Sequence, residues 1–316
     1  MVSTYLGSVG TLIPREFIAL LPVLLTMQDA EFQVDVARDC KAAASKMCLL
    51  SGNLPILRLQ LETLGDLLHR RIPMAASATM SEMGDSRLEE VEEEVEEEMF
   101  AEADVSMVSQ EDDEVIGDAE AVEELSLTPS VHQGMKLYSS WKTRHNALLY
   151  LKVLMFRNLP LFVAAPELKE QVLSLVLVGL RDADSVEVRK TASLVLGWIF
   201  HAGFLFESDE QKLLEEFERD AEVDIKQSLP VKHGGILGLC AYVRAFPYDV
   251  PQRLPEVLMA VGKHVVDKEP IRTTVTKVLS DFKRTHYDNW RDHKSMFTED
   301  QLAMLTDWLI SPSYYA

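Results

Sequence analysis

The stretch Leu180-Arg-Asp-Ala-Asp-Ser-Val-Glu-Val-Arg189 decides the fold class of this chain. It joins the end of one segment rich in Leu and Val to the start of another, with aspartates at the junction. The same order returns in Val266-Asp-Lys-Glu-Pro-Ile-Arg272, and Trp141-Lys-Thr-Arg144 is half of a further copy. In each case the arginine is followed by apolar residues at helical spacing. The pattern predicts a repeated pair of helices joined by a short turn.

Helical periodicity extends along most of the chain, and strand signals are scarce. We expect helices at 13–27, 32–49, 54–71, 141–158, 167–180, 186–201, 232–246, 252–266, 270–286 and 298–309, the last with Thr298 as its N-cap. The helix pairs recur at about 40 residues, the period of the helical-hairpin repeats called HEAT. Each such hairpin buries one face on its neighbour. The sequence therefore predicts an all-α fold, an α-solenoid of HEAT-like helical hairpins.

The charge of the chain is concentrated in one segment. The 316 residues carry a formal charge of −20, and residues 82–126 hold 20 of the 51 acids with a single base, Arg87. A segment so acidic and so poor in apolar residues cannot offset the entropy of ordering. We therefore expect HEAT-like helices at 1–73, a disordered acidic insert at 74–130, C-terminal HEAT-like repeats at 131–309 and an extended tail at 310–316.

Composition and motifs exclude several classes of function. The acidic balance argues against direct binding of nucleic acid or an anionic membrane, and no apolar stretch is long enough to span a bilayer. Cys40, Cys48 and Cys240 lack the spacing of a disulfide framework or a metal site, so we expect reduced thiols in a soluble protein. The sequence has no phosphate-binding glycine loop, G-x-S-x-G, H-E-x-x-H or C-x-x-C motif. We expect no enzymatic activity, no metal and no cofactor.

Three further groups of residues allow a functional and a structural interpretation. His286 and His293 could share a helix face and a metal, but surface or capping roles are favoured because no cysteine is near. The run Lys232-His-Gly-Gly235 either lets neighbouring helices approach closely, which is favoured, or forms an anion site at a helix start. The four tryptophans are expected in the core; they are Trp141, Trp198, Trp290 and Trp308.

The chain ends in Ser311-Pro-Ser-Tyr-Tyr-Ala316. Pro312 cannot continue a helix and favours an extended course. Two aromatic residues beside a terminal carboxylate suit a groove that pairs the carboxylate with a cation and buries the rings. The alternative is an ordinary terminus whose tyrosines fold back on the last helix.

Several C-terminal stretches together resemble one known family. They are Lys232-His-Gly-Gly-Ile-Leu-Gly-Leu239, Pro247-Tyr-Asp-Val-Pro251, Arg284-Thr-His-Tyr-Asp-Asn-Trp290, Phe297-Thr-Glu-Asp-Gln-Leu302 and the closing Ser311–Ala316. These stretches are similar to the C-terminus of the proteasome activator complex subunit 4 family, the large single-chain HEAT-repeat proteasome activators. The resemblance covers about residues 138–316. Because family members are several times longer, we expect this chain to be a C-terminal portion or a truncated product.

The resemblance implies a function that the residues alone do not. Members of the family cap the 20S proteasome core particle without ATP or ubiquitin, and are linked to the nucleus, the cytoplasm and DNA repair. Their C-terminal hydrophobic–Tyr–any tripeptide enters a pocket between two α subunits and promotes gate opening. In this chain the tripeptide is Tyr314, Tyr315 and Ala316.

A second implied feature is a reader of acetylated histones. The family's C-terminal helices have been described as bromodomain-like, with an Asn-Phe pair and a further upstream Phe. The matching residues here are Phe162 and the pair Gly203-Phe204. Glycine lacks the amide that would hydrogen-bond the acetyl group, so we expect Phe162 and Phe204 to serve the core.

Two alternatives to a proteasome activator remain open at this stage. The first is a HEAT-repeat scaffold whose acidic insert binds basic proteins such as histones. The second is a regulator that occupies the α-subunit pocket without opening the gate.

Overall fold

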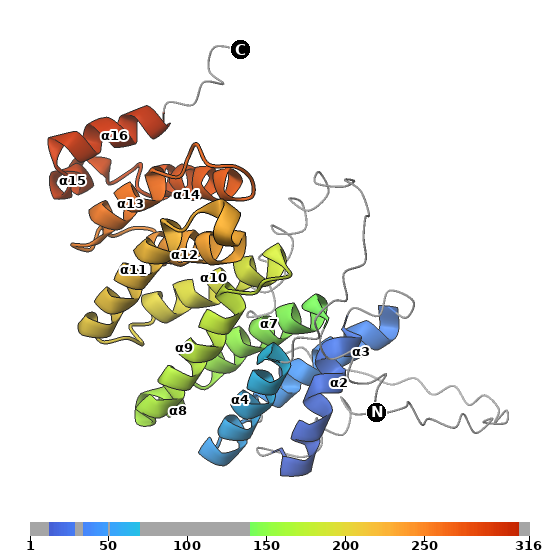
Figure 1. The fold of residues 1–316 in the computed structure, drawn as a ribbon. Coiled ribbons are helices and arrows are strands. Elements are labelled where there is room, and N and C mark those ends of the chain that lie inside the picture. Colours follow the sequence, from blue (N-terminus) through green and yellow to red (C-terminus); the bar gives the residue numbers. More distant parts are fainter. Residues whose placement is uncertain (1–12, 29–33, 50, 70–139, 310–316) are drawn as a thin grey trace, which may run out of the picture. The chain divides into compact units, whose positions relative to one another are not determined.

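The computed structural model describes residues 13–28, 34–49, 51–69 and 140–309, and every regular element in these ranges is a helix (Figure 1). The prediction of an all-α protein is thereby confirmed. The chain divides into two compact units, 1–72 with 130–316 and the intervening 73–129. The second unit lies outside the described residues, and so does the predicted acidic insert at 74–130.

The helices keep the labels of Figure 1. Their bounds are η1 (Arg15–Leu20), α2 (Leu21–Met27), α3 (Val34–Leu49), α4 (Leu54–His69), α7 (Trp141–Arg157), α8 (Leu159–Ala164), α9 (Pro166–Leu180), α10 (Val186–His201), α11 (Glu207–Ala221), α12 (Ile225–Ala245), α13 (Leu254–Gly262), α14 (Ile271–Thr285), α15 (Trp290–His293), η2 (Lys294–Met296) and α16 (Glu299–Leu309).

The described helices pack as successive hairpins. In one row α7 packs on α10, α10 on α12 and α12 on α14, while α9, α11 and α13 each pack against a member of that row. The last helix, α16, packs on α13 and α14, and the N-terminal helices α3 and α4 pack on α7. This arrangement of paired helices in neighbouring repeats is consistent with a HEAT-like solenoid.

The structure corrects four details of the predicted helices. The first predicted helix is a 3₁₀ helix followed by α2, which has Pro22 in its first turn. The acidic stretch before residue 225 forms α11, which buries Leu213, Leu214 and Phe217 although most of its residues are polar. α12 begins seven residues earlier than predicted, across a kink at Ser228. α13 ends at Gly262, before the predicted end at residue 266.

Glycines in α12 allow neighbouring helices to approach closely, as the sequence predicted. A Cβ atom on Gly234 would lie 2.6 Å from the backbone oxygen of Leu180, and one on Gly235 would lie 2.7 Å from that of Phe217. Neither backbone oxygen can move without displacing its helix. The two glycines therefore set the distance of α12 from α9 and α11.

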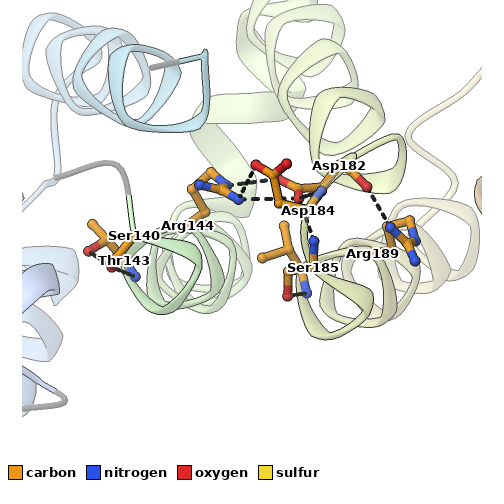
Figure 2. Close-up of polar contacts among 8 residues, drawn as sticks. Ser140, Thr143, Arg144, Asp182, Asp184, Ser185 and Arg189 are labelled. Carbon is orange, nitrogen blue, oxygen red and sulfur yellow. Dashed lines mark hydrogen bonds and ion pairs between the residues drawn. The ribbon is translucent and has the colours of Figure 1, made fainter. Parts of the chain in front are cut away.

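A row of buried polar contacts runs across the repeats, and we call it the polar ladder; it consists of Arg144, Asp182, Arg189, His233 and Thr274. Arg144 Nε donates to Asp182 Oδ2 at 2.7 Å, and Arg189 Nη1 donates to the backbone oxygen of Asp182 at 2.6 Å (Figure 2). Arg189 Nε then donates to His233 Nδ1, and His233 Nε2 lies 3.2 Å from Thr274 Oγ1. Arg144, Asp182 and Arg189, which belong to the repeat pattern seen in the sequence, thus help to join one hairpin to the next.

The ladder also fixes the turn before α10. One carboxylate oxygen of Asp182 accepts the backbone N–H groups of Asp184 and Ser185, each at 2.9 Å. Ser185 caps α10 by accepting the N–H of Val188. Figure 2 shows Arg144 pointing from α7 toward Asp182 and Asp184 in this turn.

The helices α10 and α12 share one axial register. Arg189 contacts His233, Ser193 Oγ donates to the backbone oxygen of Leu237, and His201 contacts that of Ala245. The partners are separated by 44 residues in each of these three contacts. The two helices therefore run side by side from the first turn of α10, which meets α12 at His233 beyond its kink, to the ends of both helices.

Candidate functional site

The predicted docking residues Tyr314, Tyr315 and Ala316 lie outside the described residues. What the structure describes is α16, the helix that leads into them. Thr298 is its N-cap as predicted: Gln301 N–H donates to Thr298 Oγ1 at 3.3 Å, and Thr298 N–H donates to Gln301 Oε1 at 2.9 Å. This reciprocal pair is a capping box, which fixes where the helix starts.

The other end of α16 is held by a close contact between Trp308 and Gly262, which we call the tryptophan seat. A Cβ atom on Gly262 would lie 2.0 Å from Trp308 Cζ3, so only glycine leaves room for the ring. One turn earlier, Leu305 is almost completely buried. Trp308 thus anchors the last turn of α16 on α13, directly before the point where the tail begins.

An aromatic cluster supports the neighbouring segment. The ring of His286 stacks on Phe282 with centroids 4.1 Å apart, and Trp290 and Phe297 pack around the same phenylalanine. His286 is the C-cap of α14, which agrees with a capping role, but it is buried and so is not a surface residue. Burial lowers the pKa of His286. Its neighbour His293 lies 5.1 Å from it, centroid to centroid.

The prediction that all four tryptophans are core residues holds in part. Trp290 and Trp308 are half-buried and pack against the core, whereas Trp141 is 43% exposed. Trp198 is half-buried, forms an edge contact with exposed Phe156, and has Lys152 Nζ over its ring at 5.3 Å. An aromatic ring at helical spacing can thus lie at the border of a helix pair, where one face stays open to water.

The residues matched to the acetyl-lysine reader come together in the structure. The rings of Phe162 and Phe204 have centroids 5.9 Å apart, and both rings are buried in the hydrophobic core. Lys169 Nζ lies 5.1 Å from the centre of the Phe204 ring. Gly203 has a φ of 62°, a left-handed conformation that glycine adopts freely and asparagine tolerates better than most residues.

The chemistry available to the described residues is limited. They contain no group of three or more His, Cys, Asp or Glu side chains placed to hold a metal ion. The three cysteines are free thiols, and burial raises the pKa of Cys48 and of Cys240 to about 12. Thiols of this kind are unreactive near neutral pH. Among the helices described, none combines the length and apolarity that a membrane crossing requires.

Sequence reasoning missed two features of this region. One is the tryptophan seat, because nothing in the sequence says which helix Trp308 meets. The other is a groove between α11 and α13, because α11 itself was not predicted. The signal for α11 was present in the spacing of Leu213, Leu214, Phe217 and Ala221, all of which are buried on one face.

Comparison with known proteins finds similarity to the same family that the sequence resembles. Residues 230–316 match a family model described as "Proteasome activator complex subunit 4-like, C-terminal". The chain is 40% identical over 192 residues to the human protein named "Proteasome activator complex subunit 4", an alignment that covers 56% of this chain and 10% of that protein.

More distant relatives show the same relation. "Proteasome activator subunit 4" of Arabidopsis thaliana is 36% identical over 186 residues, covering 56% of this chain and 10% of the relative. "Proteasome activator BLM10" of Saccharomyces cerevisiae is 29% identical over 175 residues, covering 51% of this chain and 8% of the relative. The chain thus spans about a tenth of the length of the curated relatives it matches.

Proposed function

We propose, from the similarity of this chain to the C-terminal part of the proteasome activator complex subunit 4 and BLM10 family, that it docks on the α ring of the 20S proteasome core particle and promotes gate opening. The docking element is the tail residues Tyr314, Tyr315 and Ala316. The observation that carries the proposal is the family match over residues 230–316, which includes this tail.

The chemistry of the tail suits a pocket between two α subunits. The carboxylate of Ala316 pairs with a cation such as a lysine in a charge-assisted hydrogen bond. Tyr315 supplies a ring to bury and a hydroxyl that hydrogen-bonds at the pocket. Gate opening follows if the bound tail makes better contacts with the open than with the closed α ring. We expect no requirement for ATP or ubiquitin, and a distribution between nucleus and cytoplasm.

The test measures binding of the full chain to purified core particle. Loss of a buried anchor residue commonly costs about 2 kcal/mol or more, which is at least roughly thirty-fold in affinity. We expect Tyr315→Ala and removal of Ala316 each to weaken binding by this factor while thermal stability is unchanged. Tyr287→Ala is a matched control, because Tyr287 is a 74% exposed tyrosine outside the tail. Equal binding after removal of the last three residues would overturn the proposal.

Two further measurements separate the remaining alternatives. A Ser311–Ala316 peptide should displace the chain from the core particle, and the same peptide with Tyr315→Ala or an amidated end should not. A fluorogenic-peptide assay then reports whether docking opens the gate or only fills the pocket. A chain that fails to bind the core particle but binds basic proteins such as histones would be a HEAT-repeat scaffold instead.

A further inference from the structure

The groove between α11 and α13 has a volume of about 730 Å³. Both helices pack on α12, and Leu239 of α12 is buried beneath them. Ala221 of α11 and Met259 and Ala260 of α13 complete an apolar lining. This lining can accept an apolar side chain from outside.

The rim of the groove is acidic. Glu215 and Glu218 of α11 and its C-cap residue Glu222 follow one another at helical spacing, so they lie on one face, and Glu256 lies across the groove on α13. All four side chains are exposed. Among the residues described, Glu218, Glu222 and Glu256 have no ion-pair partner. Their carboxylates are therefore available to a ligand.

The basic groups of the lining compensate this charge only in part, because its four glutamates face two permanent cations, Arg219 and Lys263. Arg219 Nε donates to the backbone oxygen of Glu215, and His264 Nδ1 contacts Asp267 at 2.9 Å, outside the acidic rim. Lys263 is the remaining base of the lining. Like charges three and four residues apart also oppose the formation of α11, a repulsion that a bound cation relieves.

An apolar floor with an acidic rim is complementary to one kind of ligand, a segment in which an apolar side chain is flanked by lysines or arginines. We propose that this groove is a docking site for such a basic peptide segment of a partner protein. The site lies on α11 to α13 and uses none of the tail residues. It therefore stands independently of the docking on the proteasome.

The experiment uses the full chain and a short fluorescent peptide in which leucines alternate with lysines, at physiological ionic strength. We expect Glu218→Lys with Glu222→Lys to weaken binding by at least about ten-fold, since attraction becomes repulsion at two positions. Ala260→Trp, which fills the groove without changing charge, should weaken it similarly. The matched control is Glu62→Lys with Glu170→Lys, which changes the net charge equally at exposed positions outside the groove.

The acidic residues 82–126 are present in every variant and also attract the basic peptide. The control therefore separates binding at the groove from attraction by the overall negative charge. Hydrogen exchange locates the bound peptide, and protection should appear at 215–222 and 256–264. A peptide with serine in place of leucine should bind at least about ten-fold more weakly. The proposal is overturned if the wild type does not bind, if groove and control variants lose affinity alike, if protection appears elsewhere, or if the serine peptide binds equally well.

Discussion

Replacing Gly262 by alanine is expected to release α16 from the tryptophan seat. Helix propensity alone would make alanine the better residue by up to about 1 kcal/mol, because Gly262 is the last residue of α13 and has no left-handed backbone. The new Cβ, however, would lie 2.0, 2.3 and 2.4 Å from three carbons of Trp308. Carbon atoms pack at about 3.5–4.0 Å, so the ring must move by more than an ångström.

Overpacking of this kind costs about 1–3 kcal/mol, and it can be relieved by detaching α16 from α13 while the other helices stay in place. We therefore expect amide protection within 302–309, measured by hydrogen exchange, to fall by about five- to 150-fold. Gly52→Ala is the control, since no atom lies within 4 Å of a Cβ built there. When Trp308 is already alanine, Gly262→Ala should cause little further loss of protection, because the ring that its Cβ would meet is absent. Unchanged or increased protection in α16 would show that the higher helix propensity of alanine outweighs the steric clash with Trp308.

Four further predictions concern the polar ladder, the insert and the possible reader site. Asp182→Ala deprives the buried Arg144 guanidinium of its main partner and should lower the free energy of unfolding by about 3 kcal/mol or more, measured with urea; an unchanged midpoint would contradict this. Burial lowers the pKa of His233 to about 3, below the value of about 6.5 in an unfolded chain, so its contribution to stability is complete above about pH 6.5 and is lost as the pH falls toward 3. Thermal unfolding of His233→Gln should accordingly depend less on pH than that of the wild type between about pH 7 and 5.5, and equal slopes would refute the assignment. Deleting 82–126 should leave the thermal midpoint nearly unchanged, whereas a large drop would mean that these acids are packed. The wild type should not distinguish acetylated from unmodified histone peptides, while Gly203→Asn should gain a preference; clear selectivity of the wild type would refute the view that the site has lost its function.

The ladder also explains why His233 is neutral. A guanidinium only donates, so His233 Nδ1 must accept the hydrogen bond from Arg189. The ring proton is then on Nε2, where it donates to Thr274 Oγ1. A second proton would have to occupy Nδ1 and would break the contact with Arg189. The contact with Arg189 therefore adds to burial, which is the larger cause of the lowered pKa of His233.

The sequence predicted the fold best where local signals agreed. α10 was predicted with its observed bounds from the aspartates at the junction and the apolar residues that follow at helical spacing, and the structure adds a cap at Ser185. α11 was missed because its many acidic residues outnumber a short apolar face. That face stabilises the helix only when it packs against α12. The docking tail stays a prediction from its residue types and the family resemblance, whereas the tryptophan seat depends on which helices meet. Hydrophobic periodicity predicts where helices form, but it does not predict which helices distant in the sequence contact one another.

The common register of α10 and α12 limits where this chain can change in length. Adding one residue inside either helix would turn everything beyond it by about 100° and shift it by about 1.5 Å. Contacts such as Arg189 with His233 and His201 with Ala245 could not then all survive. A residue added between 202 and 206 or between 222 and 224 would disturb none of them. In an alignment with longer relatives, gaps should therefore gather in these turns, and gap-free blocks should mark the helices that carry the register.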